Sequence, residues 1–537
     1  MAKILFSKAD LEKHIKLDSG VIDQINLFGT PAQLLGEDLE VEVFPNRPDL
    51  LSLQGFIRAI KAYLGKEVGM RKYKVKSPEK NYTVNVQASV QEVRPYTACA
   101  IVKGLTFNDS SIKQIIDLQE KIHATIGRQR KKLALGIYPL EKIKLPITYE
   151  ARKPADIKFR PLESEREMTA QEILKRHPTG QAYAHLLEKN TQYPIFIDAK
   201  KSILSMPPII NSYETGRITQ ETKEVFVECS GQDLEILKKT LNIIVTMLAD
   251  LGGIIYAMNI NYPKKIITPD LTPEKMKISL ENTNKLLGLD LKEKDLEKLL
   301  PRMGYDYKKS VIIPPWRTDI LHEVDIIEDL AIAYGYNNFK PQIPKIASIG
   351  QATKENTYKN KLAEILIGLG LLEISSYHLV KEEELTLFKM EKIALESAKT
   401  EFKVLRPSLL LPALRTFAEN KDHEYPQRIF ELGPIFKIEE SKETGIHEED
   451  HLLIACSPGN FTELKQILDY IMKSLAQEWK IKESTHPGCI EGRTASILIN
   501  EKTIGFLGEM HPEMLRSWNI KMPLACLEIS LAEFYPK

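Results

Sequence analysis

Two proline-rich segments, residues 262–273 and 341–350, interrupt this chain and limit how it can fold. Proline fixes its own φ angle and lacks a backbone N–H, so neither segment extends a helix or a central strand. The chain has 537 residues, more than one hydrophobic core accommodates, and about three to five domains are expected. The two segments therefore predict domain boundaries with a small unit between them.

Hydrophobic patterns predict an α+β multidomain protein. The last part alternates apolar and polar residues in several runs and carries amphipathic helices, which predicts an antiparallel sheet covered by helices. The part before residue 265 mixes strands with long helices at 111–132 and 233–253. The unit between the linkers combines helices with one short strand. We predict four domains, with the bounds 1–85, 86–265, 270–346 and 347–537.

Charge and cysteine content exclude several classes of protein. The 74 basic and 73 acidic side chains give a net charge of +1, so contact with nucleic acid must rest on a local patch or a partner. The five cysteines form no CxxC pair, which indicates buried reduced thiols rather than a zinc site or disulfides. The N-terminus lacks the apolar core of a signal peptide, and no apolar run approaches about 18 residues. We therefore expect a cytoplasmic protein without a membrane span.

Residues 319–329 combine five carboxylates with isoleucine, leucine and valine. We expect a helix over 320–334, with Thr318 or Asp319 near its N-cap. At about 100° per residue, one face of this helix is apolar and holds Ile320, Val324, Ile327, Ala331 and Tyr334. The opposite face is predicted to gather Asp325, Glu328 and Asp329, whereas Glu323 points away from them.

This acidic trio has two interpretations. A solvated outer face is the simpler one for an amphipathic helix. Repulsion between three like charges at i, i+3 and i+4, and the poor helix propensity of aspartate, favour a bound cation instead. Ligands that are all oxygen indicate Mg²⁺ or Ca²⁺ rather than zinc. Asp319 lies before the trio, at the junction between strand and helix.

Several motifs match one family along nearly the whole chain. They are EVEVFPNRPDLLSLQG at 40–55, DLQEKIHATIGRQRKKLALGIY at 117–138, RTDI at 317–320 with the acidic trio behind it, LRPSLLLPALRTFAENK at 405–421, RIFELGPIF at 428–436 and IGFLGEMHPEML at 504–515. In these motifs the chain resembles the beta subunit family of phenylalanine–tRNA ligase, in its short archaeal and eukaryotic-cytosolic form.

The resemblance implies a fold and a metal site. It implies a B1-like domain, a B3/B4-like editing domain, a small helical, winged-helix-like B5 domain, and a C-terminal B6/B7-like module that resembles a degenerate class II synthetase core. It also implies that the B5 domain binds Mg²⁺ through Asp319, Asp325, Glu328 and Asp329.

The resemblance further implies that aminoacylation takes place in a partner. An alpha subunit would bind ATP and phenylalanine and would join this chain in an α2β2 heterotetramer that charges tRNA(Phe). Class II motif 2 carries Phe-Arg-x-Glu, whereas this chain has Lys437 in the arginine position. Lysine cannot reproduce the two-point grip of a guanidinium on phosphate. We therefore expect no catalytic residue for aminoacylation in this chain.

Editing is the second activity that the resemblance implies. The B3/B4 domain of the family hydrolyses mischarged Tyr-tRNA(Phe), and such a pocket must recognise tyrosine by its hydroxyl group. The candidates are Asn211 and Ser212 on one predicted strand, and Glu228 and Ser230 on the next. Glu228 would accept a hydrogen bond from the phenol, while the serines would orient the ester and a water molecule. A surface position on a strand is the alternative for each residue.

The sequence is also consistent with other functions. It would also suit a stand-alone hydrolase that clears mischarged tRNA, or a non-catalytic tRNA-binding scaffold. The basic run of Arg128, Arg130, Lys131 and Lys132 fits a solvated helix end or an RNA contact. The NRPDLL segment at 46–51 lacks the glycines of a phosphate-binding loop, so we interpret it as a structural turn.

Overall fold

The computed structural model describes residues 2–344 and 347–535, and the chain divides into two compact units, residues 1–342 and 343–537. The predicted boundary between 346 and 347 and the final bound at 537 fall on residues outside the described ones. Within the described residues, no helix combines the length and apolar character needed to cross a membrane.

A small antiparallel sheet in the order β1-β3-β2 opens the first unit. Its elements are β1 (Ala2–Ser7), α1 (Lys8–Glu12), α2 (Ser19–Leu27), β2 (Ala32–Leu35), β3 (Asp38–Val43) and α3 (Leu53–Tyr63). Ser52 caps α3, because its hydroxyl accepts a hydrogen bond from the Gly55 N–H. Phe56 of α3 is fully buried and packs against Phe6 of β1, with ring centroids 5.1 Å apart.

A large mixed sheet forms the centre of the first unit. Its strand order is β13 (Ile210–Asn211), β12 (Ile203–Met206), β11 (Tyr193–Ile197), β8 (Ile147–Arg152), β5 (Thr83–Val86), β15 (Ile254–Asn261), β6 (Tyr96–Lys103), β14 (Glu224–Gly231) and β7 (Leu133–Pro139), with β4 (Val75–Lys76) and β16 (Ile266–Thr268) also paired to β15. Around it lie α4 (Asp109–Ala124), β9 (Lys158–Phe159), β10 (Met168–Thr169), α5 (Ala170–Arg176), α6 (Pro178–Tyr183), α7 (Tyr213–Gly216) and α8 (Leu234–Asp250).

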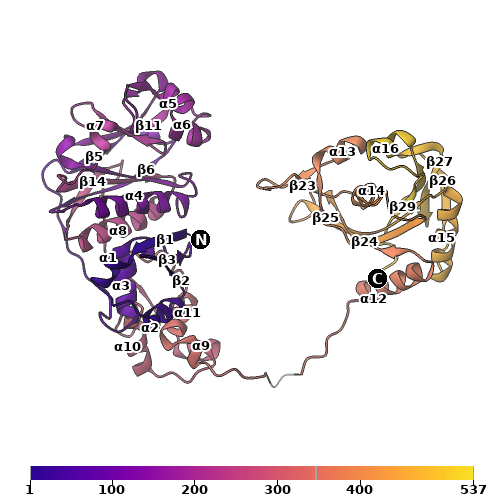
Figure 1. Cartoon of the computed structure of the whole chain (residues 1–537), viewed down its shortest axis with the longest axis horizontal. Helices are drawn as coiled ribbons and strands as arrows, with labels where there is room; N and C mark the ends of the chain where they lie inside the picture. Colours follow the sequence, from indigo (N-terminus) through magenta and orange to yellow (C-terminus); the bar gives the residue numbers. More distant parts are fainter. Residues whose placement is uncertain (1, 345–346, 536–537) are drawn as a thin grey trace. The chain divides into compact units, whose positions relative to one another are not determined.

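Alternating residues of β14 face opposite sides of this sheet. Val225 and Val227 belong to the core that α4 and α8 cover. Helix α8 contacts β6 and β14, and α4 contacts β7 (Figure 1). Phe226 belongs to a second core together with Tyr138 of β7. Glu228 has the same parity as Phe226 and therefore lies on the side away from α8.

The sheet curls until its two outer strands, β7 and β13, approach each other. Although they are the two ends of the strand order, the Tyr138 hydroxyl of β7 lies 3.2 Å from Asn211 Oδ1 of β13. Arg130, just before β7, donates a hydrogen bond of 2.7 Å to the Ile209 carbonyl beside β13. Side chains thus join two edges that backbone pairing leaves apart, and a cavity lies between them.

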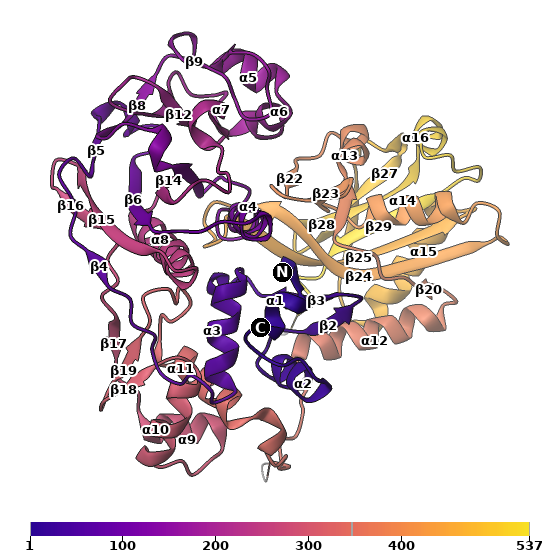
Figure 2. The same ribbon diagram turned by 60° about the vertical axis from the view of Figure 1, so that its left-hand side comes forward.

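The next part of the first unit groups three helices with a small sheet. Its elements are β17 (Glu274–Met276), α9 (Leu280–Leu287), α10 (Glu293–Arg302), β18 (Asp306–Tyr307), β19 (Val311–Ile313) and α11 (Glu323–Tyr334), and its sheet has the order β17-β19-β18. Figure 2 shows α9, α10 and α11 gathered together. Leu296, Leu300, Ile326 and Leu330 are completely buried between them. The sequence predicted one short strand in this unit, whereas the structure has three, each of two or three residues.

An antiparallel sheet organises the second unit, as predicted. Its order is β20 (Leu372–Glu373), β24 (Gln427–Ile438), β25 (Ile446–Ser457), β29 (Ala525–Ser530), β28 (Lys502–Met510), β27 (Cys489–Ile499) and β26 (Lys480–Glu483), and β20 alone among these described strands runs parallel to its neighbour. A smaller sheet holds β21 (Leu379–Lys381), β23 (Phe402–Leu405) and β22 (Ile393–Ala394). The helices are α12 (Lys354–Gly368), α13 (Glu382–Phe388), α14 (Leu410–Glu419), α15 (Phe461–Ser474) and α16 (Pro512–Ser517).

Alternation along β25 builds a core on each face of this sheet. Leu452 and Ile454 pack with residues of α12 and α15. Leu453 and Ala455, one position on, pack with residues of α14. The unit is therefore layered, with a sheet between helices, because the period of two along the strand supplies apolar residues to both sides.

The basic run lies in a loop and not at a helix end. Helix α4 ends at Ala124, and the φ angles of Arg128, Gln129 and Arg130 are 46°, 53° and 64°. A right-handed helix cannot continue through residues with positive φ. The helix predicted over 111–132 was therefore too long by about two turns.

Candidate functional site

A cavity of about 850 Å³ lies between the two edges of the large sheet. Isoleucines of α4 form one part of its apolar wall, and residues 207–210 form another. Arg130 and residues of the loop after α7 also line it. Ala134 and Leu135 contribute from β7, and Asn211 from β13. Pockets that hold small-molecule ligands span about 300–1,000 Å³, so this cavity has the size of a genuine binding site.

The polar end of the cavity is built by Glu228 and Asn211, with Tyr138 joining them. The Tyr138 hydroxyl lies 3.1 Å from Glu228 Oε1 and 3.2 Å from Asn211 Oδ1. One hydroxyl proton serves one acceptor at a time. The Tyr138 hydroxyl therefore donates either to Glu228 or to Asn211. All three groups are satisfied together only when Glu228 carries a proton and donates it to Tyr138, which frees the Tyr138 hydroxyl to donate to Asn211.

The surroundings of Glu228 favour its protonated form. Burial raises the pKa of Glu228 to about 8, even though the hydrogen bond with Tyr138 and the charge of Arg94 act in the opposite direction. Its Oε2 atom is buried and has no hydrogen-bond partner among the described residues. An ionised carboxylate is costly in such a place. Glu228 is therefore a neutral acid near pH 7 with one oxygen left open.

Asn211 and Glu228 both line the cavity, whereas the two predicted serines do not. Ser230 is fully buried behind the cavity, where Arg94 Nε donates to its hydroxyl at 3.2 Å. The Ser212 hydroxyl donates to Glu214 Oε2 at 3.0 Å. Neither serine is among the residues that line the cavity, so their assigned task of orienting an ester and a water finds no support in this arrangement.

Gly136 is the reason that Tyr138 reaches Glu228. In the strand register Gly136 pairs with Glu228. A Cβ atom on Gly136 would lie 2.2 Å from the Tyr138 hydroxyl. The missing side chain leaves the space into which Tyr138 turns. Sequence reasoning missed Tyr138, because only the pairing of β7 with β14 shows that this tyrosine meets Glu228.

His123 lines the cavity but is held by its own surroundings. Its Nε2 accepts a hydrogen bond of 2.9 Å from the Leu135 N–H. Burial lowers the pKa of His123, although Glu120 and Leu135 act to raise it. A neutral imidazole whose Nε2 lone pair is already used cannot serve as a general base through that nitrogen. We interpret His123 as a structural residue that fixes α4 to β7.

The carboxylate helix begins later than predicted. Helix α11 starts at Glu323, and His322 is its N-cap in place of Thr318 or Asp319. Asp325 Oδ2 accepts hydrogen bonds of 2.8 Å from the N–H groups of Leu321 and His322. Asp325 therefore stands in the first turn, where a carboxylate stabilises the helix without any cation.

Asp329 faces the interior, which corrects the predicted acidic face. It accepts hydrogen bonds from the Tyr305 hydroxyl and, at 2.8 Å, from Arg317 Nη2. Glu328 is exposed, so the two neighbours point apart. Val324, predicted in the core, is 47 % exposed. The buried face consists instead of Ile326, Ile327, Leu330, Ala331 and Ala333.

Arg317 holds Asp319 as well as Asp329. Its Nε and Nη2 donate to the two oxygens of Asp319 at 2.8 and 2.7 Å, a two-point fork. Burial acts to raise the pKa of Asp319, but the charge and hydrogen bonds of Arg317 outweigh it and hold that pKa below its usual value. Both aspartates are hydrogen-bonded partners of one buried guanidinium.

The hydrogen bonds of these carboxylates decide whether they can also bind Mg²⁺. Within residues 2–344 and 347–535, no three or more His, Cys, Asp or Glu side chains converge in a way that could hold a metal ion. Asp319 and Asp329 are paired with Arg317, Asp325 caps the helix, and Glu328 points to solvent. The arrangement does not fit a preformed Mg²⁺ site, so a metal at these residues stays a prediction.

Two family models match the chain. The tRNA synthetase B5 domain matches residues 258–336, which include α9 to α11. The phenylalanyl tRNA synthetase beta chain CLM domain matches residues 340–531, nearly all of the second unit.

Relatives over the full length decide the family. A phenylalanine–tRNA ligase beta subunit from Pyrococcus abyssi is 41% identical over 506 residues, which cover 91% of this chain and 90% of the relative. The chain belongs to the phenylalanine–tRNA ligase beta subunit family. The beta subunit from Archaeoglobus fulgidus is 36% identical over 546 residues, with 98% and 97% of the two chains covered.

A solved structure supports the same membership. The crystal structure of an N-terminal fragment of the phenylalanyl-tRNA synthetase beta-subunit from Pyrococcus horikoshii is 39% identical, with a TM-score of 0.59, and covers 62% of this chain and 99% of the fragment. The family predicted from the motifs is thus confirmed, and the chain is a ligase subunit of the archaeal type. Lys437, the residue predicted to stand at the motif 2 arginine position, lies on β24 and pairs with Glu449 at 2.8 Å.

Proposed function

We propose that the 850 Å³ cavity of this beta subunit hydrolyses mischarged Tyr-tRNA(Phe). The observation that carries the proposal is Glu228 Oε2, a buried polar atom without a described partner at the inner end of a ligand-sized cavity. A tyrosine hydroxyl would donate a hydrogen bond to that atom. Phenylalanine would bury the same atom unpaired, which costs about 1–3 kcal/mol.

The neutral state of Glu228 sharpens this selectivity. When Glu228 donates its proton to Tyr138 and the Tyr138 hydroxyl donates to Asn211, the second oxygen of Glu228 is an uncharged acceptor. A tyrosine phenol donates to it without any change of charge in a dry pocket. Recognition therefore requires neither an ion pair nor ionisation of the phenol.

The residues that line the cavity support ester hydrolysis by a positioned water molecule. The described lining offers His123 with its Nε2 engaged, and neither a serine nor a cysteine lies among the lining residues. Attack on the tyrosyl ester would come from a water molecule held by the cavity beside the carbonyl carbon, and the ester bond to the terminal ribose would break. Holding the water molecule and the ester in the right geometry accelerates hydrolysis without a protein nucleophile.

The experiment compares Glu228→Ala and Glu228→Gln with the unaltered chain, each assembled with its alpha subunit. Glu228→Ala is expected to lower hydrolysis of Tyr-tRNA(Phe) at least about tenfold, which corresponds to about 1.4 kcal/mol. Phe-tRNA formation should stay unchanged and serves as the control for folding and assembly. Unaltered Tyr-tRNA hydrolysis in Glu228→Ala would remove the assignment.

We further propose the wider setting of this subunit. An alpha subunit completes an α2β2 heterotetramer in the cytoplasm and attaches phenylalanine to tRNA(Phe) with ATP, while this chain contributes no catalytic residue to that step. Lys437 of β24, which pairs with Glu449 of β25, supports this division, because a lysine cannot replace an arginine that binds phosphate at two points. The four-domain division at 1–85, 86–265, 270–346 and 347–537 is part of the same proposal.

A pull-down of the tagged chain from its native cell, with mass determination of the complex, tests the partnership. An equal amount of a second class II subunit with intact arginine motifs is the expected result. A chain recovered alone would favour the stand-alone hydrolase, and a chain that binds tRNA without hydrolysing Tyr-tRNA would favour the scaffold.

A further inference from the structure

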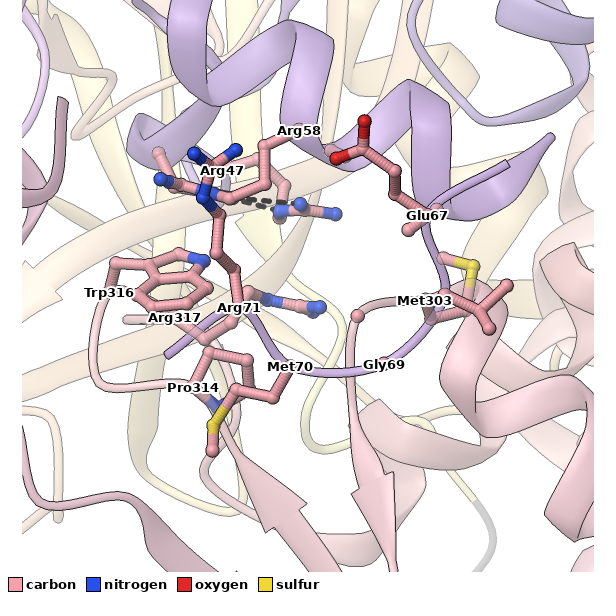
Figure 3. Close-up of a pocket in the computed structure, with 15 residues that line it drawn as sticks. Arg47, Arg58, Glu67, Gly69, Met70, Arg71, Met303, Pro314, Trp316 and Arg317 are labelled. Atoms are coloured by element: carbon pink, nitrogen blue, oxygen red, sulfur yellow. Dashed lines mark hydrogen bonds and ion pairs between the residues drawn. The ribbon is translucent and has the colours of Figure 1, made fainter. Parts of the chain in front are cut away.

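A second cavity of about 210 Å³ lies in the first unit, away from the one described above, and arginines surround it. Arg47, Arg58 and Arg71 come from the N-terminal segment, and Arg317 comes from the segment before α11. Figure 3 shows Arg47, Arg58 and Arg71 on the same side of the space as Trp316, with Glu67 and Met303 on the other. The fold thus brings together guanidinium groups from two distant stretches of sequence.

Two of these arginines each form a two-point ion pair with an aspartate close by in the sequence. Arg47 donates through Nε and Nη2 to the two oxygens of Asp49, both at 2.9 Å. Arg317 does the same with Asp319. In each case arginine and aspartate are two residues apart, as in Arg-Pro-Asp and Arg-Thr-Asp. Each fork fixes a guanidinium in a defined direction and leaves Nη1 outside the fork.

The other two arginines share one carboxylate. Arg58 Nη1 donates to Asp250 Oδ2 at 2.8 Å, and Arg71 Nε lies 3.2 Å from Asp250 Oδ1. Arg58 also lies over the Trp316 ring, with its Cζ atom 4.3 Å from the ring centroid. Stacking and pairing hold Arg58 rigidly, while Arg71 has half of its side chain exposed at the mouth.

The charges are arranged so that the cavity surface is cationic. Asp250, Asp319 and Asp329 neutralise these arginines from behind and do not line the cavity. Of the carboxylates that do line it, Asp49 is forked to Arg47, and Glu67 pairs with Lys61 at 2.6 Å. A visiting group therefore meets guanidinium donors first.

One donor has no acceptor. Arg317 Nη1 is buried and has no hydrogen-bond partner among the described residues, and the Arg317 side chain is 2 % exposed. A buried charged donor left unpaired is costly, and such groups in native proteins normally have a ligand or an ordered water. We propose that this cavity is an anion site that takes a phosphate group.

Size and donor geometry set the chemical class. The cavity is smaller than the range of about 300–1,000 Å³ typical of small-molecule pockets, which favours a compact anion over a whole nucleotide. Planar guanidinium donors converging from several directions match the tetrahedral oxygens of phosphate. The phosphate group belongs either to free inorganic phosphate or to the backbone of a bound RNA.

Titration calorimetry of the full-length chain with inorganic phosphate, at constant ionic strength set by chloride, tests the site. We expect one binding event per chain. Arg71→Gln should weaken it about tenfold, the effect of losing one charged hydrogen bond. Arg71 is half exposed, so this variant is expected to fold. Arg176→Gln is the matched control, since Arg176 is an exposed arginine on α5, which does not line the cavity.

Equal phosphate affinity in the unaltered chain, Arg71→Gln and Arg176→Gln would overturn the proposal, as would the absence of phosphate binding to the unaltered chain. Thermal unfolding in phosphate against chloride gives a second measure, with a higher Tm expected for the unaltered chain and a smaller rise for Arg71→Gln. Repeating the titration with saturating tRNA(Phe) identifies the source. Loss of phosphate binding assigns the site to the RNA backbone, and retained binding assigns it to the free anion.

Discussion

Each of the two cavities of the first unit contains a deeply buried ionisable side chain, but only one of these side chains has an ion-pair partner among the described residues. In the larger one, Glu228 is buried without an ion pair among the described residues, and its pKa rises to about 8 because burial penalises the charged form. In the smaller one, Arg317 is just as buried but keeps its proton, and it is paired with both Asp319 and Asp329. A buried carboxyl group can become neutral, whereas a buried guanidinium must be paired. One cavity is thereby suited to a neutral hydroxyl group and the other to an anion.

The largest effect is expected from Arg317→Met, which breaks the pairing in the smaller cavity. Two buried carboxylates would lose their cation, and the loss of one partner from a buried pair costs about 3–5 kcal/mol of unfolding free energy. Urea denaturation at pH 7 measures it. Arg176→Met on α5 should change stability by less than about 0.5 kcal/mol. A loss below about 1 kcal/mol for Arg317→Met would show that the aspartates are neutralised in another way.

The next effect concerns the neutral carboxyl group in the larger cavity. The pKa of Glu228 is about 8 in the folded chain against an ordinary value of 4.5, so the folded state binds the proton more tightly. Its stabilising contribution is complete below pH 4.5, falls as the pH rises through the window between these values, and is gone above about 8, with a slope of up to about 1.4 kcal/mol per pH unit. Glu228→Gln removes this dependence. Denaturation curves from pH 5 to 9 for both chains are the measurement, and parallel profiles would contradict the assigned proton.

A smaller effect tests the space that lets Tyr138 reach Glu228. Gly136→Ala would place a Cβ atom 2.2 Å from the Tyr138 hydroxyl, and overpacking of this kind costs about 1–3 kcal/mol. Tyr-tRNA hydrolysis should fall with it, since the displaced tyrosine no longer shares the proton of Glu228. Gly368→Ala, where nothing lies within 4 Å of the added atom, is the matched control. Unchanged hydrolysis and stability in Gly136→Ala would rule out the shared proton.

The smallest effect separates a helix cap from a metal ligand. Asp325→Ala removes the acceptor of two N–H groups at the start of α11, and loss of such a cap costs about 1 kcal/mol. If Asp325 acts only as a cap, the Tm decreases equally with and without Mg²⁺. If it also binds Mg²⁺, the decrease grows as Mg²⁺ is added. Glu323→Gln, at a position excluded from the predicted ligands, should leave the Mg²⁺ response unchanged.

Regular elements of this chain were predictable because their signals are local. The α3 cap at Ser52, helix α8 and the long strands of the second unit follow from cap chemistry and from periods of 3.6 and 2. The start of α11 was not predictable in this way. His322 and Asp325 form a cap together, and the pattern of apolar residues alone extended the helix back to Ile320.

The candidate sites were predictable only in part, because they depend on contacts between distant segments. Glu228 and Asn211 were found from their strands, since both are polar in apolar surroundings. Tyr138 was missed, and Arg130 was named only as part of the basic run, because the curl of the sheet that brings β7 to β13 leaves no mark in either segment. Asp329 was assigned to the outer face since only the fold shows Arg317 and Tyr305 beneath it.

The curl of the large sheet also affects how this chain avoids unwanted partners. An outer strand with free N–H and C=O groups is a template onto which another chain can add and aggregate. Here β13 has two residues, and β7 is occupied by contacts with α4 and α7. The hydrogen bonds that Tyr138 and Arg130 make toward β13 hold these two outer strands facing each other. The same closure that forms the cavity therefore protects the sheet from aggregation, and a variant that opens it should lose solubility along with its ligand.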